Sequence, residues 1–354
     1  MMLQALCVAV LLAGSAMAWG AGEATTAPAD WVTVKVKRLG DKPIITPEMF
    51  KDRKEGANIN GPTLLRVPAW IKNPLGKYYL YFGNHRGTYI RLAYADALVG
   101  PWKLHEGGVL SLEQLPVKMD HIASPEILVD DAGKRLIMYY HGTPRDKEAA
   151  PAGTPMKLDN PGRWSGQLSF ASTSADGLTF APRPQVMSSF YLRVFAYGGK
   201  FYGVCKDNNI SSQLGRTGDP LTALAKGPAV FPGSRHVALL PQGDTLWVFF
   251  SRVGEAPEHI YMTRFDLKED WTRWGSSAPP AVSVIKPEKL WEGTNYALKP
   301  SESGPSVHVQ ELRDPFVFVE DGKIYLLYSV AGEMGIALAE LEFVPKEKGP
   351  QAGK

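Results

Sequence analysis

The stretch KYYLYFG at residues 77–83 is the first of five similar segments along this chain of 354 residues. The others are RLIMYYH at 135–141, KFYGVCK at 200–206, TLWVFFS at 245–251 and KIYLLYS at 323–329. Each segment starts with a polar residue and continues through apolar, mostly aromatic or β-branched positions. Short runs of this kind are typical of strands buried on both faces. Their repetition indicates a repeat architecture, and here a β-propeller.

Each repeated segment has a strand-like partner before and after it. The preceding partners are residues 62–68, 125–131, 193–198, 236–241 and 315–321, and the following ones are 89–96, 167–173, 212–217, 259–267 and 335–341. Weaker outer strands are predicted at 102–104 and 179–180. Five such units predict an all-β fold, a five-bladed β-propeller.

The segment WVTVKVK at residues 31–37 supplies the fourth strand that the last unit lacks. Its valines alternate with polar residues, which is the period of a half-exposed strand. Pairing the two ends of the chain would close the ring and leave fewer open sheet edges. We therefore predict one propeller domain at residues 31–344 and a disordered tail at 345–354.

Two long segments interrupt the pattern of strands. Residues 142–165 are rich in Pro, Gly and Ala, and residues 275–310 separate the fourth unit from the fifth. Long loops in a compact domain are often lids or walls of a binding site. The alternative interpretation is that both are solvent-exposed insertions.

The N-terminal residues predict export from the cell. No charged side chain precedes Glu23, and an apolar stretch ends in the small-x-small pattern of residues 16–18. We predict a signal peptide at residues 1–18 and a secreted or periplasmic protein, with no membrane attachment after cleavage. The alternative is an uncleaved anchor, for which the apolar run is short. Cys205 is then the sole remaining cysteine, and its place in a strand fits a core residue.

The overall charge argues against one class of partner. The formal net charge is +3, and the sequence has no prominent run of Lys or Arg. A nucleic-acid partner is therefore not predicted. No oligomeric state follows from the sequence.

The innermost strands of a propeller line its axis, and their starts gather around one mouth. Alignment of the five starts gives one register with Gly61, Ser124, Arg193, His236 and Asp314. The residues one position before these are Asn60, Ala123, Leu192, Arg235 and Arg313. The residues two positions after the first set are Thr63, Glu126, Phe195, Ala238 and Phe316. A buried charge is costly unless it is paired or used. We therefore place the functional site at this mouth.

Two short motifs carry a resemblance to a known group of enzymes. LRDP at residues 312–315 resembles the RDP motif that opens an inner strand in the five-bladed glycoside hydrolases, and SPEI at 124–127 resembles their APD/APE motif. This group includes arabinanases, β-xylosidases, α-L-arabinofuranosidases, anhydrogalactosidases and the invertase–levansucrase enzymes. More loosely, WEG at 291–293 and SESG at 301–304 are similar to a late loop of these propellers. The resemblance implies a carbohydrate substrate and a carboxylate at the axis.

The chain departs from the pattern of that group in two blades. The base Asp that the group carries in its first blade is replaced by Asn60-Gly61-Pro62, and the acid Glu of its third blade by Tyr191-Leu192-Arg193.

Cleavage of a glycosidic bond needs one group that donates a proton and one that activates water or attacks the sugar. We predict Asp314 as the base and Glu126 as the acid or as the group that tunes its pKa. The alternatives are an Asp314 that only binds backbone and a Glu126 that only neutralises an arginine. No cofactor is predicted.

Three arginines are expected at the same mouth, namely Arg193, Arg235 and Arg313. Together with Asn60 they are candidates for substrate binding. Guanidinium groups bind carboxylates and sulfates in two-pronged contacts, so an anionic sugar is one interpretation. The alternative is that the arginines neutralise Asp314 and Glu126.

Four histidines lie at suggestive positions. His121 and His236 precede or open inner strands and are candidates for proton transfer. His85 and His141 lie at the ends of the repeated segments of the first two units, and with Asp120 they are candidates for substrate binding. The spacing of these residues is not that of a compact metal site, so no metal is predicted.

Three functions fit this sequence. The first is a secreted glycoside hydrolase acting on a plant or algal polysaccharide or oligosaccharide. The second is a polysaccharide lyase on the same scaffold, with His121, Tyr296 and Arg235 in the roles of base and charge neutraliser. The third is a carbohydrate-binding propeller without catalysis.

Overall fold

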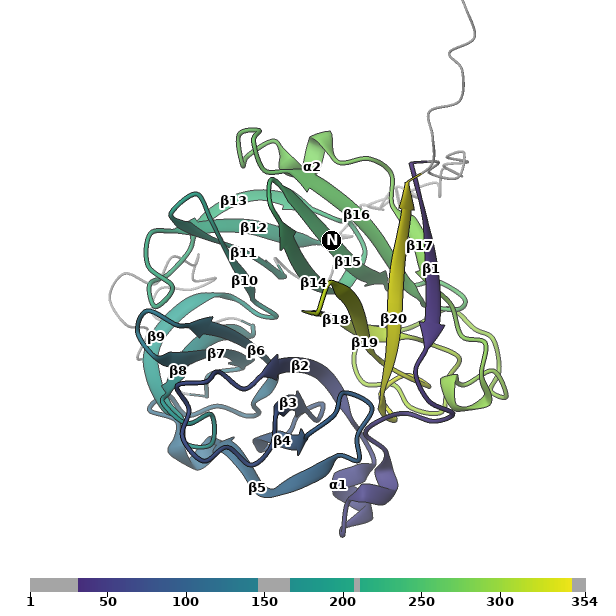
Figure 1. The fold of residues 1–354 in the computed structure, drawn as a ribbon, viewed down its shortest axis with the longest axis horizontal. Coiled ribbons are helices and arrows are strands. Elements are labelled where there is room, and N and C mark those ends of the chain that lie inside the picture. The colour runs from purple at the N-terminus through teal and green to yellow at the C-terminus, as the bar shows by residue number, and fades with distance from the viewer. Residues whose placement is uncertain (1–30, 146–165, 207–210, 346–354) are drawn as a thin grey trace, which may run out of the picture.

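The computed structural model describes residues 31–145, 166–206 and 211–345. In this part of the chain, five four-stranded sheets surround a central axis (Figure 1). The predicted five-bladed β-propeller is therefore confirmed. The signal peptide predicted at 1–18 lies outside the described residues, as do the tail predicted at 345–354, except Pro345, and most of the loop predicted at 142–165.

Four blades are built from consecutive strands. Blade 1 contains β2 (Asn60–Arg66), β3 (Tyr78–Gly83), β4 (Tyr89–Ala95) and β5 (Lys103–Ser111), and blade 2 contains β6 (Ala123–Asp130), β7 (Arg135–Gly142), β8 (Leu168–Ser174) and β9 (Ala181–Ser189). Blade 3 contains β10 (Arg193–Tyr197), β11 (Lys200–Lys206), β12 (Ser212–Thr217) and β13 (Ala225–Val230), and blade 4 contains β14 (Ser234–Gln242), β15 (Thr245–Arg252), β16 (Ile260–Asp266) and β17 (Val282–Ile285).

Blade 5 joins the two ends of the described chain. It contains β18 (Arg313–Glu320), β19 (Lys323–Ser329), β20 (Ile336–Pro345) and, on the outer edge of β20, β1 (Val32–Arg38). In the antiparallel pairing of β1 with β20, Val34 lies opposite Phe343 and Val36 opposite Leu341. Figure 1 shows β1 and β20 side by side. The closing strand predicted from the alternating valines is confirmed.

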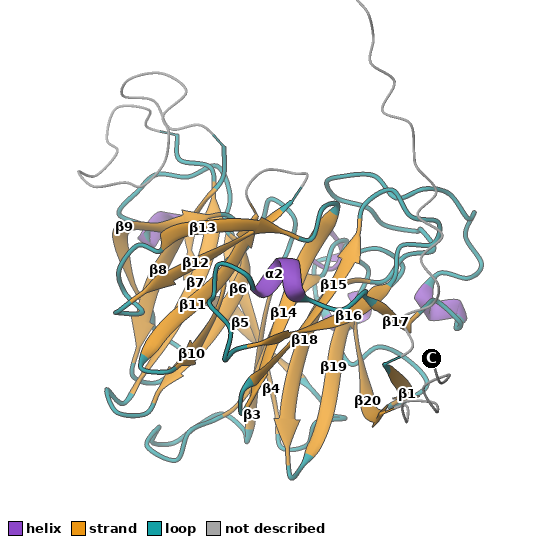
Figure 2. Cartoon of the chain, turned by 90° about the horizontal axis from the view of Figure 1, so that it is seen from above, coloured by secondary structure: helices purple, strands orange, loops and turns teal. Residues whose placement is uncertain are grey.

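Helical structure is short and lies outside the sheets (Figure 2). The helical elements are η1 (Pro47–Met49), α1 (Arg53–Gly56), η2 (Leu112–Gln114), α2 (Trp274–Ser277) and η3 (Leu290–Glu292). The segment predicted as one loop at residues 275–310 therefore contains β17 and η3. A strand of four residues is too short for its period to stand out in the sequence. The outer strand predicted at 179–180 was also misplaced, because β9 begins at Ala181 and carries its apolar residues near its far end.

The hydrophobic core is divided into five clusters, one between each pair of neighbouring blades. Strand β3 shows why the repeated segments are apolar at nearly every position. Tyr79 and Tyr81 pack with blade 2, whereas Leu80 and Phe82 face the opposite way and pack with blade 5. Successive side chains of a strand point to opposite faces of the sheet. A strand whose sheet is packed between two neighbouring blades therefore needs apolar residues at both odd and even positions.

The first strands of the blades form the innermost ring. Each of β2, β6, β10, β14 and β18 contacts the next, and β18 contacts β2 to complete the circle. Figure 1 places these five strands around the centre of the molecule. Their N-terminal ends therefore bring residues from all five blades to one axis.

Candidate active site

A shared irregularity opens the inner strands. In blade 1, Asn60 pairs with Gly83 and Thr63 with Tyr81, so the register slips by one residue between the two pairs. The same slip occurs between Ala123 and Glu126, between Ser234 and Val237, and between Arg313 and Phe316. Bulges of this kind turn side chains out of the regular pleat. They place the residue that follows the first pair at the mouth of the axis.

Positive φ angles mark the mouth positions of blades 1, 2, 3 and 5. Gly61, Ser124 and Asp314 have φ of 60°, 48° and 49°. Tyr191 has φ of 56°, and the carbonyl of the preceding Phe190 accepts a hydrogen bond from Lys206 N at 2.8 Å. Tyr191 is therefore the counterpart of Ser124 and Asp314 in blade 3. Residues other than glycine rarely adopt this backbone region, and when they do it is often at functional sites.

The predicted register was wrong in blades 3 and 4. In blade 3 the mouth residue is Tyr191, and Arg193 lies two residues further in, level with Thr63 and Glu126. In blade 4 Ser234 pairs with Arg252, so Arg235 is at the mouth and His236 follows it. The error has a physical cause. These two blades lack the proline that marks the start of the inner strand in the others, so the position of the bulge could not be read from the sequence.

Asp314 and His236 form a buried pair at the axis. Nδ1 of His236 contacts Oδ1 of Asp314, and the hydroxyl of Ser329 donates to Oδ2 at 3.2 Å. Asp314 is 1% exposed. Burial by itself would raise the pKa of Asp314, but His236 and two nearby arginines hold that pKa well below its usual value. Burial lowers the pKa of His236 despite the pull of Asp314. Asp314 is therefore an ionised acceptor that orients the imidazole.

A row of rings connects this pair to His121. The ring of Tyr191 lies 3.7 Å from that of His236 and 4.3 Å from that of His141, centroid to centroid. His141 in turn lies 5.7 Å from His121. Burial raises the pKa of Tyr191 and lowers that of His141, so both rings are neutral. Neither ring nitrogen of His141 has a hydrogen-bond partner within the described ranges.

His121 ends the row and is held by a second carboxylate. Its Nδ1 lies 2.5 Å from Oδ1 of Asp120, and its Nε2 lies 3.0 Å from Oε1 of Gln167. Both ring nitrogens thus face an oxygen acceptor. The Asp120 side chain is 49% exposed. Burial opposes ionisation of Asp120, but its hydrogen bond to His121 lowers its pKa. The His121–Asp120 pair therefore combines a fixed orientation with access to solvent.

A cavity of about 540 Å³ opens over this row. The sequence-predicted residues that line it are Asn60, His85, Asp120, His121 and His141. Tyr191 and Arg86 also line it, as do residues 303–305. The segment 275–310 thus contributes a wall of the cavity, which was one of its two predicted roles. Most of the polar residues proposed for substrate binding are brought to one place.

Glu126 lies deeper than the lining of the cavity. The hydroxyl of Thr63 donates to its carboxylate at 3.1 Å, and Nε of Arg193 lies 3.5 Å away. Burial raises the pKa of Glu126 to about 6, although Arg193 and Thr63 pull that pKa down. Arg193 is almost completely buried and also donates to the carbonyl of Pro125 at 3.2 Å. The two residues form a charged layer inward of the mouth.

The other two predicted arginines are bound by glutamates. Arg235 makes a two-pronged contact with Glu258, at 2.7 and 2.8 Å. Arg313 donates to Glu311 at 2.6 Å and to Glu333 at 3.2 Å. All three glutamates are buried, and neither arginine lines the cavity. These contacts match the interpretation in which the arginines balance buried carboxylates, but the glutamates differ from those expected.

The remaining candidates take subsidiary positions. Asn60 donates to the side chain of Asn58 at 3.3 Å, and Nδ1 of His85 lies 3.5 Å from Glu333. Tyr296 packs against His308, with ring centroids 5.5 Å apart, and does not line the axial cavity. Cys205 is buried in blade 3.

Two further properties concern metals and membranes. Within residues 31–145, 166–206 and 211–345, no group of three or more His, Cys, Asp or Glu side chains is arranged to hold a metal ion. Over the same ranges, no helix has the length and apolar character needed to cross a membrane.

The fold and the axial cluster define a five-bladed β-propeller of the architecture seen in several glycosidases. Three solved structures share it: an exo-1,5-α-L-arabinanase from a bovine ruminal metagenomic library, the α-L-arabinofuranosidase of Lactobacillus brevis and the GH62 α-L-arabinofuranosidase domain of Coprinopsis cinerea. Their TM-scores are 0.51, 0.52 and 0.52, at 11%, 13% and 11% identity. The matches cover 83%, 79% and 90% of this chain and 98%, 90% and 98% of those chains. At this identity the likeness shows the fold alone.

The sequence identifies the family directly. The uncharacterized protein R118 of Acanthamoeba polyphaga mimivirus is 34% identical over 318 residues, which is 80% of this chain and 83% of that protein. The chain belongs to the same family as R118. No family model matches the sequence.

Proposed function

We propose that the protein is a carbohydrate-active enzyme that hydrolyses glycosidic bonds at the axial cavity. One observation carries the proposal: Tyr191 and His121 line the same cavity, and each belongs to a cluster that contains a carboxylate. At one end Tyr191 packs on His236, which Asp314 holds. At the other end His121 is held by Asp120.

The pairing suits acid–base catalysis. Cleavage of a glycosidic bond needs a proton given to the leaving oxygen and a proton taken from the attacking water. His121 has access to the cavity and acts as the proton donor. The Tyr191 oxygen takes the proton from water as its own phenolic proton passes to His236, and the ionised Asp314 stabilises the resulting positive charge on the imidazole.

The shared architecture supports a glycan substrate. The solved structures with this fold are named as an arabinanase and arabinofuranosidases. Binding at the mouth of the axis fits a cavity lined by amide, imidazole, hydroxyl and phenol groups, which hydrogen-bond to sugar hydroxyls. We propose export, with activity in the periplasm or outside the cell, from the apolar segment ahead of residue 18.

The charge of the cavity bears on the substrate. Arg235 and Arg313 are occupied by glutamates, and Arg193 by Glu126. Arg86 and Asp120 are the lining residues with fixed opposite charges. A neutral glycan therefore fits the cavity without further charge compensation.

A second candidate is β-elimination, the reaction of a polysaccharide lyase. Tyr191 favours it, because a phenol packed between two histidines can pass a proton to and from a uronate. Elimination would require the acid group of the substrate to be neutralised, for which Arg86 is the candidate in the cavity.

Product analysis decides between the two reactions. The purified protein is incubated with arabinan, xylan, galactan and polygalacturonate, and products are followed by mass and by ultraviolet absorbance. Hydrolysis gives new reducing ends whose mass includes one added water. Elimination gives an unsaturated, absorbing product without added water. If neither product forms from any polysaccharide of this panel, the proposed catalysis is wrong.

A further inference from the structure

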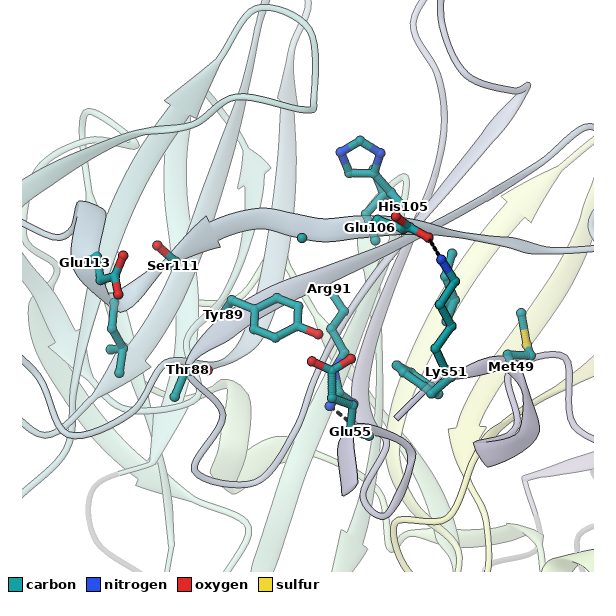
Figure 3. A pocket seen from close by; sticks show the side chains of 15 residues that line it. Met49, Lys51, Glu55, Thr88, Tyr89, Arg91, His105, Glu106, Ser111 and Glu113 are labelled. Atoms are coloured by element: carbon teal, nitrogen blue, oxygen red, sulfur yellow. Dashed lines mark hydrogen bonds and ion pairs between the residues drawn. The ribbon is translucent and has the colours of Figure 1, made fainter. Parts of the chain in front are cut away.

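A second cavity lies on blade 1, away from the axis. Its volume is about 790 Å³, and none of its lining residues lines the axial cavity. Its walls come from the segment between η1 and α1, from β4, and from β5 with η2. Figure 3 shows these side chains around the space. The proposed reaction uses none of them.

Tyr89 provides a flat apolar surface in this cavity. The ring is half-buried and extends from β4 toward Glu55 and Arg91 (Figure 3). Gly108 makes room for it: a Cβ at this position, where φ is +66°, would lie 2.4 Å from the ring. Phe50, Leu92 and Leu104 complete an apolar lining. The backbone of β5 thus packs closely against the Tyr89 ring, which itself lines the cavity.

Arg91 provides a hydrogen-bond donor on the wall. It is 4% exposed, and its guanidinium donates to the carbonyls of Asn58 and Glu55 at 2.8 and 2.5 Å. The guanidinium also stacks over Phe50, 4.7 Å from the ring centroid. Its Nε has no hydrogen-bond partner in the described chain. A buried donor without a partner is costly, which indicates that a ligand or water completes it.

The rim is acidic. The charged lining residues are three glutamates and two cations: Glu55, Glu106 and Glu113, with Lys51 and Arg91. Lys51 is paired with Glu106, whereas Glu55 and Glu113 are exposed. The hydroxyls of Thr88 and Ser111 lie on the same rim. An excess of carboxylates disfavours an anion and provides strong acceptors for hydroxyl groups.

We propose that this cavity binds a neutral oligosaccharide, as a second saccharide site separate from the axis. The C–H face of a sugar ring packs on Tyr89, its hydroxyls donate to Glu55 and Glu113, and Arg91 Nε donates to a sugar oxygen. Such a mixture of one aromatic face with convergent polar groups is typical of small-ligand sites. If the axial site cuts glycans as proposed, a chain held here raises the concentration of substrate near it.

Titration calorimetry with three neutral probes tests the binding. The probes are arabinohexaose, xylohexaose and galactohexaose, and the protein is the full chain carrying Asp314→Asn, which prevents cleavage. We expect at least one probe to bind, and Tyr89→Ala to weaken one class of site about tenfold or more, equivalent to ~1.4 kcal/mol. Tyr89→Phe, which keeps the ring, is the matched control and should retain binding.

Two exposed positions provide alternative variants in case Tyr89→Ala does not fold. If the melting curve shows that Tyr89→Ala is unfolded, Glu55→Ala and Glu113→Ala take its place, because neither side chain contributes to the core. Each should weaken the same class of site, and oligogalacturonate should bind there more weakly than the neutral probes.

Several results would overturn the proposal. They are no binding of any neutral probe, binding that none of the three substitutions changes, or tighter binding of oligogalacturonate at this cavity. Failure of the axial function is distinguishable: Tyr89-dependent binding would then persist, although the wild-type protein releases no products from the polysaccharide panel.

Discussion

Nδ1 of His236 contacts Oδ1 of Asp314 at the axis of the propeller, and both side chains are almost completely buried. The two residues come from neighbouring blades, since β14 contacts β18. The pair therefore joins blades 4 and 5 and fixes the imidazole against Tyr191. Its orientation depends on the register of two strands rather than on a flexible loop.

The substitution Asp314→Asn tests this relationship. Asn has the same shape but no charge, so it cannot stabilise a protonated His236. We expect kcat to fall about a thousand-fold or more, as when the carboxylate behind a catalytic histidine is replaced by an amide. Activity is measured on whichever glycan of the panel is cleaved, and folding by thermal melting.

Ser329→Ala is the matched control for Asp314. It removes the hydrogen bond to Oδ2 and leaves the contact with His236 in place. We expect less than about a tenfold loss of kcat, the worth of one ordinary hydrogen bond. Equal losses in both variants would contradict a specific role for the charge of Asp314.

Tyr191→Phe removes the phenol and keeps the ring between His141 and His236. If the hydroxyl takes part in proton transfer, kcat should fall about 10²- to 10⁴-fold, with little change in KM. The thermal melt should stay within a few degrees of wild type. A variant with normal kcat would reduce Tyr191 to a packing role.

The pKa of Glu126 predicts how stability depends on pH. Its folded-state pKa of about 6 lies above the usual 4.5, so the native state binds the proton more tightly than the unfolded chain. The resulting stabilisation is complete below pH 4.5 and is lost as pH rises through 6. The loss amounts to about 2 kcal/mol.

Glu126→Gln isolates that contribution. Urea unfolding of both proteins from pH 4 to 7 gives their difference in free energy of unfolding. Because Gln does not titrate, the difference should change by about 2 kcal/mol between pH 4 and 7. Parallel curves over this range would show that Glu126 titrates normally.

The sequence predicted the fold more completely than it predicted the site. The apolar middle strands, such as residues 78–83, were predictable because strands between two blades are apolar at both parities. The closing strand was predictable because its valines alternate. The short β17 was missed because four residues give no period.

The sequence predicted where the site lies in the propeller, but not how its side chains contact one another. His121 and Asp314 were identified because polar residues near the starts of inner strands stand out, and His141 because it ends a middle strand. The role of Tyr191 was missed, because the missing acid of blade 3 was assigned to Arg193 and the contacts of Tyr191 with two histidines depend on a backbone irregularity that the sequence does not reveal. The glutamates that hold the arginines were missed for a related reason, because Glu258 and Glu333 lie in connections distant in sequence from their partners.

Arg235 and Glu258 provide a test of buried charge. Removing one partner leaves an unpaired charge, so Glu258→Gln should lower the free energy of unfolding by about 3–5 kcal/mol. The double variant Arg235→Met/Glu258→Leu should recover much of this loss, because it removes both charges of the pair and leaves neither partner uncompensated. Chemical denaturation measures both.

An exposed ion pair serves as the reference for that experiment. Lys35 and Glu342 are 3.2 Å apart with side chains 63% and 65% exposed. Lys35→Ala should change the free energy of unfolding by less than about 1 kcal/mol. If Glu258→Gln has no larger effect than Lys35→Ala, the buried pair does not stabilise the axis.

The pairing of β1 with β20 has a consequence for how the protein is made. On the ribosome β1 is the first of the described strands to be synthesised and β20 the last, so β1 must remain without its partner during nearly all of translation. A polypeptide released early lacks both Asp314 and the strand that covers β1, and it exposes an unpaired edge that chaperones and proteases recognise. Completion of the axial cluster and closure of the ring therefore coincide at the end of translation.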